Sequence, residues 1–218
     1  MAADAPRVAL IHALAHSVEP VNAEFARTWP ECTRMNLLDD SLSADLARGG
    51  GVLDARMTAR FIALAAYAID TGAQGILFTC SAFGPCIDAV KARWPQVPVL
   101  KPNEAMIGDA VRSGARRIGL VASFAPTLAS MPAEFPPGVT VLPALADGAL
   151  AALDRGDTAE HDRRVAAAAR AVADQGCDVV VLAQFSLARA APAVREAVGL
   201  PVLTTPGSAV RALADRLK

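Results

Sequence analysis

The chain repeats itself, and the repeat limits its fold more than any other feature. Three pairs of segments match in the same order, at residues 72–83 and 176–187, 97–102 and 200–206, and 7–12 and 117–122. Gly176 lies 104 residues after Gly72, so each copy is about 100 residues long. Two unrelated alanine-rich βα units would also look alike, but agreement of three segments in order favours a duplicated fold.

Short apolar runs alternate with alanine-rich stretches along both halves. The expected strands are Arg7–Ala13, Arg34–Leu38, Gly75–Thr79, Val97–Leu100, Arg117–Ala122, Val139–Leu142, Asp178–Ala183 and Pro201–Leu203. Most of these runs are apolar throughout, as in strands that helices cover on both faces of a parallel sheet.

Helices are expected between the strands. Asp54–Thr71 places its apolar residues on one stripe and ends at Gly72, and Asp157–Gln175 opens with Asp157 and Glu160 in capping-box spacing. The βαβα order predicts an α/β fold with parallel sheets flanked by helices.

Composition excludes several classes of function. The 218 residues are 53% hydrophobic, with 21 Lys and Arg against 22 Asp and Glu and no basic block, so we expect neither a nucleic-acid nor a membrane partner. Apolar stretches end well before the roughly 18–20 residues of a membrane span. The N-terminal segment lacks the layout of a secretory signal, so we expect a cytoplasmic protein. The composition leaves a homo-oligomer open.

Polar residues follow several expected strands, and ligands of open α/β sheets bind beyond the carboxyl ends of the strands. The candidates for such a site are His12, Asp40, Ser41, Thr79, Cys80, Ser81, Ser123, Gln184, Phe185 and Ser186. The strings HExxH, GxSxG, Walker A and GxGxxG are absent, so the sequence predicts no metal and no nucleotide cofactor.

Cys80 is the strongest candidate for chemistry. It follows an apolar run directly and precedes a turn of small residues that leads into a helix, where free amides and the helix dipole favour a thiolate. The alternative is a buried, inert cysteine. Cys32 and Cys177 precede their strands, at the opposite edge of the sheets, and Cys86 is expected to pack within the next helix.

Two histidines and one glycine run require separate interpretation. His12 ends a strand and could activate the Cys80 thiol or contact substrate. His161 has charged neighbours on a helix, so we expect it on the solvated surface. Gly49–Gly51 is expected to be a mobile loop, conceivably a lid.

The segment Phe78-Thr79-Cys80-Ser81-Ala82-Phe83-Gly84, its counterpart around Gln184 and the Pro-Val-Leu turns resemble the aspartate/glutamate/hydantoin racemase superfamily. The resemblance covers the whole chain. It implies a cofactor-independent enzyme of two pseudo-symmetric α/β domains with the active site in a cleft between them. We assign residues 1–102 and a C-terminal helix, 207–218, to the first domain and residues 103–206 to the second.

In racemases of this superfamily, a cysteine from each half flanks the substrate. The first corresponds to Cys80, but the second corresponds to Gln184, whose amide is neutral and cannot exchange protons as an acid or base. The resemblance implies an isomerase that acts at the α-carbon of a small carboxylate or amino-acid derivative. Cys80 would be its base or nucleophile, and Gln184 would orient the substrate from the other half.

Three functional hypotheses remain from the sequence. The first is a racemase in which Ser186, His12 or water replaces the second thiol. Another is a single-cysteine decarboxylase or cis–trans isomerase of the same superfamily, although its decarboxylases keep the second cysteine rather than the first. The last is a non-catalytic protein that binds carboxylates. The other candidates would serve as substrate-binding residues: His12, Asp40, Ser41, Thr79, Ser81, Ser123, Phe185 and Ser186.

Overall fold

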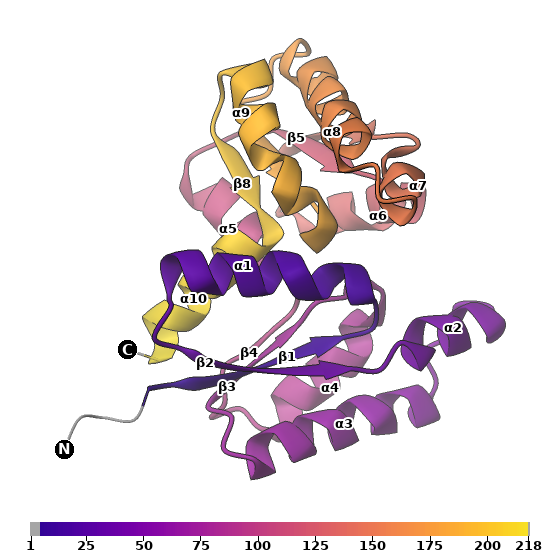
Figure 1. The fold of residues 1–218 in the computed structure, drawn as a ribbon, viewed down its shortest axis with the longest axis vertical. Helices are drawn as coiled ribbons and strands as arrows, with labels where there is room; N and C mark the ends of the chain where they lie inside the picture. The colour runs from indigo at the N-terminus through magenta and orange to yellow at the C-terminus, as the bar shows by residue number, and fades with distance from the viewer. Residues whose placement is uncertain (1–4, 218) are drawn as a thin grey trace. The chain divides into compact units, whose positions relative to one another are not determined.

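The first half of the chain forms a four-stranded parallel sheet (Figure 1). A computed structural model describes residues 5–217. The strands pair in the order β2-β1-β3-β4 and comprise β1 (Arg7–His12), β2 (Thr33–Leu38), β3 (Gly75–Phe78) and β4 (Val99–Leu100). Parallel strands that meet in this order place all their carboxyl ends at one edge of the sheet.

Helices cover both faces of this sheet. On one face lies α1 (Val18–Thr28), and on the other lie α3 (Ala55–Asp70) and α4 (Gly84–Arg93) (Figure 1). The short helix α2 (Ser41–Arg48) follows β2 directly. The core on the α3 side is built from strand residues and from the inward stripe of α3, including Ile11, Phe61 and Phe78.

The second half repeats this arrangement. Its parallel strands pair in the order β6-β5-β7-β8 and comprise β5 (Arg117–Ala122), β6 (Thr140–Leu145), β7 (Val179–Leu182) and β8 (Val202–Thr204). The helices that follow in the chain are α5 (Glu104–Arg112), α6 (Ala125–Ser130), α7 (Ala149–Asp154), α8 (Thr158–Ala173), α9 (Ala191–Val198) and α10 (Thr205–Leu217), and α10 belongs to the first unit from Ala209 onward. The α/β class with parallel sheets flanked by helices is therefore confirmed.

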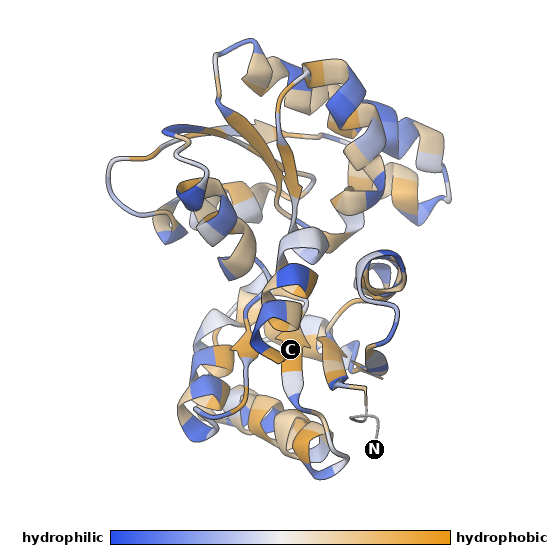
Figure 2. Ribbon diagram, turned by 90° about the vertical axis from the view of Figure 1, so that its left-hand side faces the viewer, coloured by the Kyte–Doolittle hydropathy of each residue, from blue (hydrophilic) through white to orange (hydrophobic). Residues whose placement is uncertain are grey.

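Packing divides the chain into two compact units. Unit 1 comprises the chain up to Glu104 and from Ala209 onward, and unit 2 comprises Ala105–Ser208. Figure 2 shows hydrophobic strands in both units, with hydrophilic residues distributed along the helices. None of the helices that the structure describes is long and apolar enough to cross a membrane.

The two longest helices begin as their sequences predict. The Asp54 carboxylate accepts a hydrogen bond from the Met57 amide at 2.7 Å, and the Asp157 carboxylate accepts one from the Glu160 amide at 3.1 Å. These bonds satisfy amides that the helix itself leaves unpaired. The expected stripe of α3 is buried except for Leu64, which is half-buried.

One expectation about α8 is wrong. His161 was expected on the solvated surface, but only 1% of its side chain is exposed. The buried residues of α8 include His161, Val165, Ala169 and Val172, and their spacing of three to four residues places them on one helical face. The inward stripe therefore decides its position, and its charged neighbour Asp162 bonds the ring at 2.7 Å.

Strand boundaries also differ from the sequence-based expectation. β4 is shorter than expected, whereas β6 continues from Thr140 to Leu145 through Pro143. Proline has no N–H to donate, and β6 lies at the edge of its sheet, where one side of the strand needs no partner.

Candidate functional site

Cys80 lies at the carboxyl edge of the first sheet, two residues beyond β3. Its backbone is extended, and a 3₁₀ turn at Ser81–Phe83 leads from it into α4. The Ala82 amide and the Ser43 hydroxyl both hydrogen-bond its sulfur. Cys80 is half-buried, whereas Cys32, Cys86 and Cys177 are buried and all four thiols are free. It is therefore the most accessible of the four thiols.

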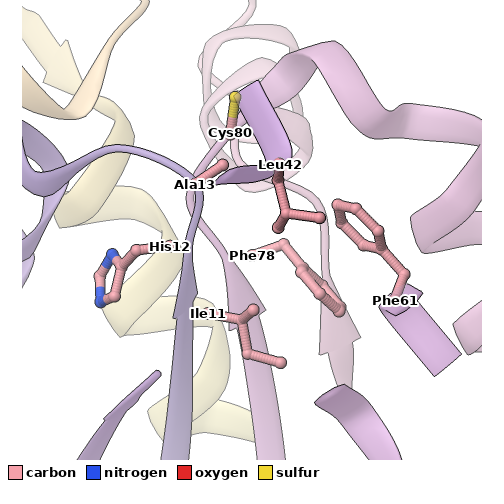
Figure 3. A pocket seen from close by; sticks show the side chains of 7 residues that line it. All are labelled: Ile11, His12, Ala13, Leu42, Phe61, Phe78 and Cys80. Carbon is pink, nitrogen blue, oxygen red and sulfur yellow. The ribbon is translucent and has the colours of Figure 1, made fainter. Parts of the chain in front are cut away.

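A narrow apolar hollow adjoins the thiol (Figure 3). Its lining residues are Ile11, His12, Ala13, Leu42, Phe61, Phe78 and Cys80, and it has no room for a water molecule. Burial raises the pKa of Cys80, and the hydrogen bonds from Ala82 and Ser43 only partly oppose this rise. The Ala82 amide favours the thiolate, as expected beside a helix N-terminus, but burial is the larger effect.

His12 does not contact Cys80. Successive side chains of a strand point to opposite faces, and the His12 ring points away from the other six residues of the hollow (Figure 3). The ring is fully buried. Its Nδ1 lies 3.0 Å from both the Ser17 and Thr79 hydroxyls, and its Nε2 lies 3.0 Å from the Asn36 side-chain oxygen. These contacts hold the His12 ring among Ser17, Thr79 and Asn36.

The partners of His12 fix its protonation. The Asn36 oxygen accepts hydrogen bonds and already receives one from Asn22, so His12 Nε2 carries the hydrogen and donates it. Nδ1 is then the acceptor. Burial lowers the pKa of His12 despite the Asn36 hydrogen bond, so the ring is neutral near pH 7. The imidazole therefore holds the Thr79 hydroxyl on the α1 face of the sheet.

Thr79, a predicted substrate-binding residue, is buried in the structure. Only 7% of it is exposed, and its hydroxyl lies 2.8 Å from that of Ser17 and 3.0 Å from His12. By contrast, Ser81 is exposed and begins the turn that follows Cys80. Of the two hydroxyl residues that flank Cys80, only Ser81 is open to solvent.

An ion-pair network joins α2 to α3 near Cys80. The Arg60 guanidinium lies 2.7 Å from the Asp39 carboxylate and 2.6 Å from that of Asp45, and it donates to the Ser41 hydroxyl at 2.6 Å. Burial tends to raise the pKa of Asp39, but Ser41 and Arg60 outweigh it and hold the pKa below its ordinary value. Ser41 is therefore engaged within the protein, while Asp40 is exposed at the start of α2.

Two residues of this region escaped the sequence analysis. Ser43 donates to the Ala13 carbonyl at 3.1 Å and also bonds the Cys80 sulfur, and Arg60 holds the carboxylates beside it. The chain separations are 37 residues between Ser43 and Cys80 and 21 between Arg60 and Asp39. Local sequence patterns carry no signal for contacts of this range.

The carboxyl edge of the second sheet brings Ser123 and Gln184 together. The Gln184 side-chain oxygen accepts hydrogen bonds from the Ser123 amide at 2.6 Å and from the Ser123 hydroxyl at 3.0 Å. A backbone amide can only donate, so this contact fixes the oxygen and turns the Gln184 NH₂ group away from it. Ser186 is half-buried. Phe185, a predicted substrate-binding residue, is only 4% exposed and packs inside its unit.

The side chains at the carboxyl edges of the two sheets can take part in different chemistry. The Cys80 thiol can give up and take back a proton, whereas the Gln184 amide can only donate or accept hydrogen bonds. In the described part of the chain, no group of three or more His, Cys, Asp or Glu side chains is arranged to hold a metal ion.

The chain is similar to several known proteins. The sequence profile of the family described as Asp/Glu/Hydantoin racemase matches residues 22–213. Allantoin racemase from Klebsiella pneumoniae is 20% identical over 98% of this chain and 88% of its own, with a TM-score of 0.73. An aspartate racemase homologue from Pyrococcus horikoshii OT3 is 15% identical over 96% and 98%, with a TM-score of 0.72.

An unliganded arylmalonate decarboxylase is 19% identical over 97% of this chain and 92% of its own, with a TM-score of 0.68. At these identities the solved structures show a shared fold. A search of curated proteins gave no match. The family profile spans most of the chain, including both sheet edges described above, and the protein belongs to the Asp/Glu/hydantoin racemase family.

Proposed function

We propose that the protein is an enzyme that moves a proton at the α-carbon of a small carboxylate or amino-acid derivative, with Cys80 as its base or nucleophile. One observation carries the proposal: the most accessible of the four thiols stands at a carboxyl sheet edge, where the Ala82 amide and the Ser43 side chain act on its sulfur. Family membership supports the same reaction class.

The proposed step uses only this chain's own groups. The Cys80 thiolate takes the α-proton, and the electrons of the C–H bond move into the adjacent carbonyl as an enolate. The resulting S–H returns a proton to carbon. Ser81, beside the thiol, would bind a carboxylate or carbonyl oxygen of the substrate.

The test is hydrogen exchange. The protein is incubated in D₂O with panels of amino acids, hydantoins and malonates, and deuterium at the α-carbon is measured by mass spectrometry or NMR. We expect exchange with wild type and with Cys86→Ala, the matched control, and at least a 100-fold loss with Cys80→Ala, the scale of general acid–base catalysis, about 10²–10⁴. Binding without exchange or consumption would instead indicate a non-catalytic carboxylate-binding protein.

A second candidate is a single-thiol reaction, such as decarboxylation followed by protonation, or cis–trans isomerisation. Two observations favour it over racemisation by two bases. Gln184 cannot supply an acid or base from the second unit. Burial also raises the pKa of Cys80 above its ordinary value of 9.0, so the resting group is a protonated thiol, ready to act as an acid. One of the structural neighbours is described as a decarboxylase.

The pH dependence of the rate separates the two roles of the thiol. A rate that needs the thiolate should climb with pH until the raised pKa of Cys80 is passed. A rate that needs the thiol should be level through neutral pH and fall above that pKa. The comparison is made for each substrate that the enzyme consumes.

A further inference from the structure

Helix α2 covers the Cys80 thiol. Leu42, in its first turn, is buried and lines the same hollow as Cys80 (Figure 3). Ser43 bonds both the Ala13 carbonyl and the Cys80 sulfur. The hollow has no room for water. A reagent that approaches the sulfur from this side must therefore displace α2.

A single arginine holds this helix. The Arg60 guanidinium, carried by α3, bonds Asp39 just before α2, Ser41 at its start and Asp45 in its middle. These contacts are 2.6–2.7 Å long, and the charged side chains are only 27–37% exposed. Because one residue reaches both the start and the middle of the helix, its loss removes the polar contacts between α2 and α3 at both places.

The far end of α2 is suited to bending. Gly50 and Gly51 have positive φ angles of 66° and 81°, and a Cβ at either would meet no atom within 4 Å. Consecutive glycines in open space absorb backbone rotation readily, as hinge positions must. The other end is fixed, because the Asp39 amide bonds the His12 carbonyl at 3.0 Å.

Unit 2 lacks this arrangement. β2 and β6 match with an offset of 107 residues, from Leu38 to Leu145, so Asp39 and Asp45 correspond to Ala146 and Ala152. Arg164, the counterpart of Arg60, bonds the Asp147 backbone carbonyl and the Glu160 side chain of its own helix. The pair of Asp39 and Asp45 thus occurs in unit 1, which carries Cys80, and has no counterpart in unit 2, which carries Gln184.

We propose that Arg60 is a positioning residue that latches α2 over Cys80 through Asp39 and Asp45, so that release of the latch opens the thiol to reactants. The proposal rests on the proposed role of Cys80 and extends it to the control of access. Arg60 itself touches no reacting atom.

Alkylation of the thiol tests the latch without any substrate. The rate constant for iodoacetamide labelling is measured at Cys80 and at Cys86 by peptide mass spectrometry. The variants are Arg60→Gln, the conservative Arg60→Lys, and Arg56→Gln as a control that removes an exposed arginine of the same helix. Asp45→Asn removes one of the two ion pairs and leaves the arginine in place.

Labelling of Cys80 should rise about three- to tenfold in Arg60→Gln, the scale expected for loss of two partly exposed ion pairs. Asp45→Asn and Arg60→Lys should give smaller increases, and Arg56→Gln should match wild type. Labelling of the buried Cys86 should not change. A wild-type rate at Cys80 in Arg60→Gln, or an equal rise at Cys86, would overturn the proposal, since the latter means that the whole unit has loosened.

The pH profile of labelling adds a readout that a general loss of stability would not produce. Burial raises the pKa of Cys80, so release of α2 in Arg60→Gln should shift the midpoint to lower pH. Ser43→Ala removes a hydrogen bond that lowers this pKa and should shift the midpoint to higher pH. The latch is contradicted if the labelling midpoints of Arg60→Gln and Ser43→Ala both equal that of wild type, or if both shift in the same direction from it. Failure of the D₂O exchange with a positive labelling result would reject the proposed reaction alone.

Discussion

At the scale of single residues, His161 is a buried imidazole with one nitrogen unsatisfied. Its Nδ1 lies 2.7 Å from the Asp162 carboxylate, whereas its buried Nε2 has no hydrogen-bond partner among the described residues. In α3, Met57 stands at the corresponding place of the inward stripe, 104 residues earlier. Unit 2 therefore buries a polar atom where unit 1 buries a thioether.

We expect His161→Met to raise the free energy of unfolding by about 1 kcal/mol, because an unsatisfied buried polar group costs about 1–3 kcal/mol and the Asp162 carboxylate keeps Arg189 as a partner. Urea unfolding measures the change. The reciprocal Met57→His is the control and should be destabilising. A loss of stability in His161→Met would mean that the imidazole gains more from its surroundings than it costs.

His12 predicts a pH dependence of stability. Burial lowers its pKa in the folded protein, while the unfolded chain titrates near the ordinary 6.5. Below pH 6.5 the unfolded state therefore binds a proton that the folded state does not, and the free energy of unfolding falls as the pH drops toward the lowered value. Above pH 6.5 this contribution is absent.

The measurement is urea unfolding of wild type and His12→Gln between pH 7.5 and 5. The difference in unfolding free energy between them should shrink as the pH falls. Only wild type has an imidazole that must stay neutral in the folded protein while the unfolded chain binds a proton. A difference that stays constant over this range contradicts a lowered pKa.

Some of these residue placements are readable from sequence, and others are not. The position of Cys80 beyond an apolar strand follows from the run that precedes it, and strand alternation already separates His12 from Ile11 and Ala13. The spacing of His161 from Val165 and Ala169 indicates its burial. The contacts of Ser43 and Arg60 depend on the path of α2, which no local pattern specifies.

At the scale of elements, α8 packs directly against β5 at Gly119. A Cβ added there would lie 2.6 Å from a methyl of Val172 and 3.0 Å from the sulfur of Cys177. In unit 1, the atoms closest to a Cβ at Gly75 would be the flexible ends of Leu217 and Leu213, at 3.0 and 3.3 Å, and the Pro98 carbonyl oxygen would lie at an ordinary 3.5 Å. Glycine thus sets the distance between helix and sheet at Gly119 more strictly than at Gly75.

Gly119→Ala should therefore lower the free energy of unfolding by about 1–3 kcal/mol, the usual cost of overpacking, and more than Gly75→Ala does. Adding Val172→Ala should recover part of the loss, because it removes the closest atoms. Thermal and urea unfolding of the four proteins measure both effects. A double variant no more stable than Gly119→Ala would show that the contact with Val172 is not the cause.

The elements themselves are largely predictable. Each of the eight expected apolar runs overlaps a strand, because apolar side chains must be covered on both faces of a parallel sheet. Their ends shift by one to three residues, as at β4 and β6. Helix α2 is harder to predict. This eight-residue helix is rich in polar residues and follows β2 without a separate capping signal, since Asp40 makes no side-chain cap.

At the scale of the whole molecule, two copies of one fold have diverged at equivalent sites. The copies share strand order and pairing, with Arg7 opposite Thr33 in one sheet and Arg117 opposite Thr140 in the other. The internal repeat made this duplication readable from sequence. The copies differ chemically at one pair of equivalent positions. Unit 1 has the Cys80 thiol there, and unit 2 has the Gln184 amide, whose oxygen accepts hydrogen bonds from Ser123.

The stereochemical course of exchange tests the central claim, that one unit alone supplies the acid–base group. A chiral substrate that wild type exchanges in D₂O is recovered, and its deuterium content and configuration are measured together. The account predicts deuterium incorporation with retained configuration, because Cys80 removes and returns the proton on one face, and inversion only after Gln184→Cys. Inversion by wild type at a rate comparable to exchange would contradict it.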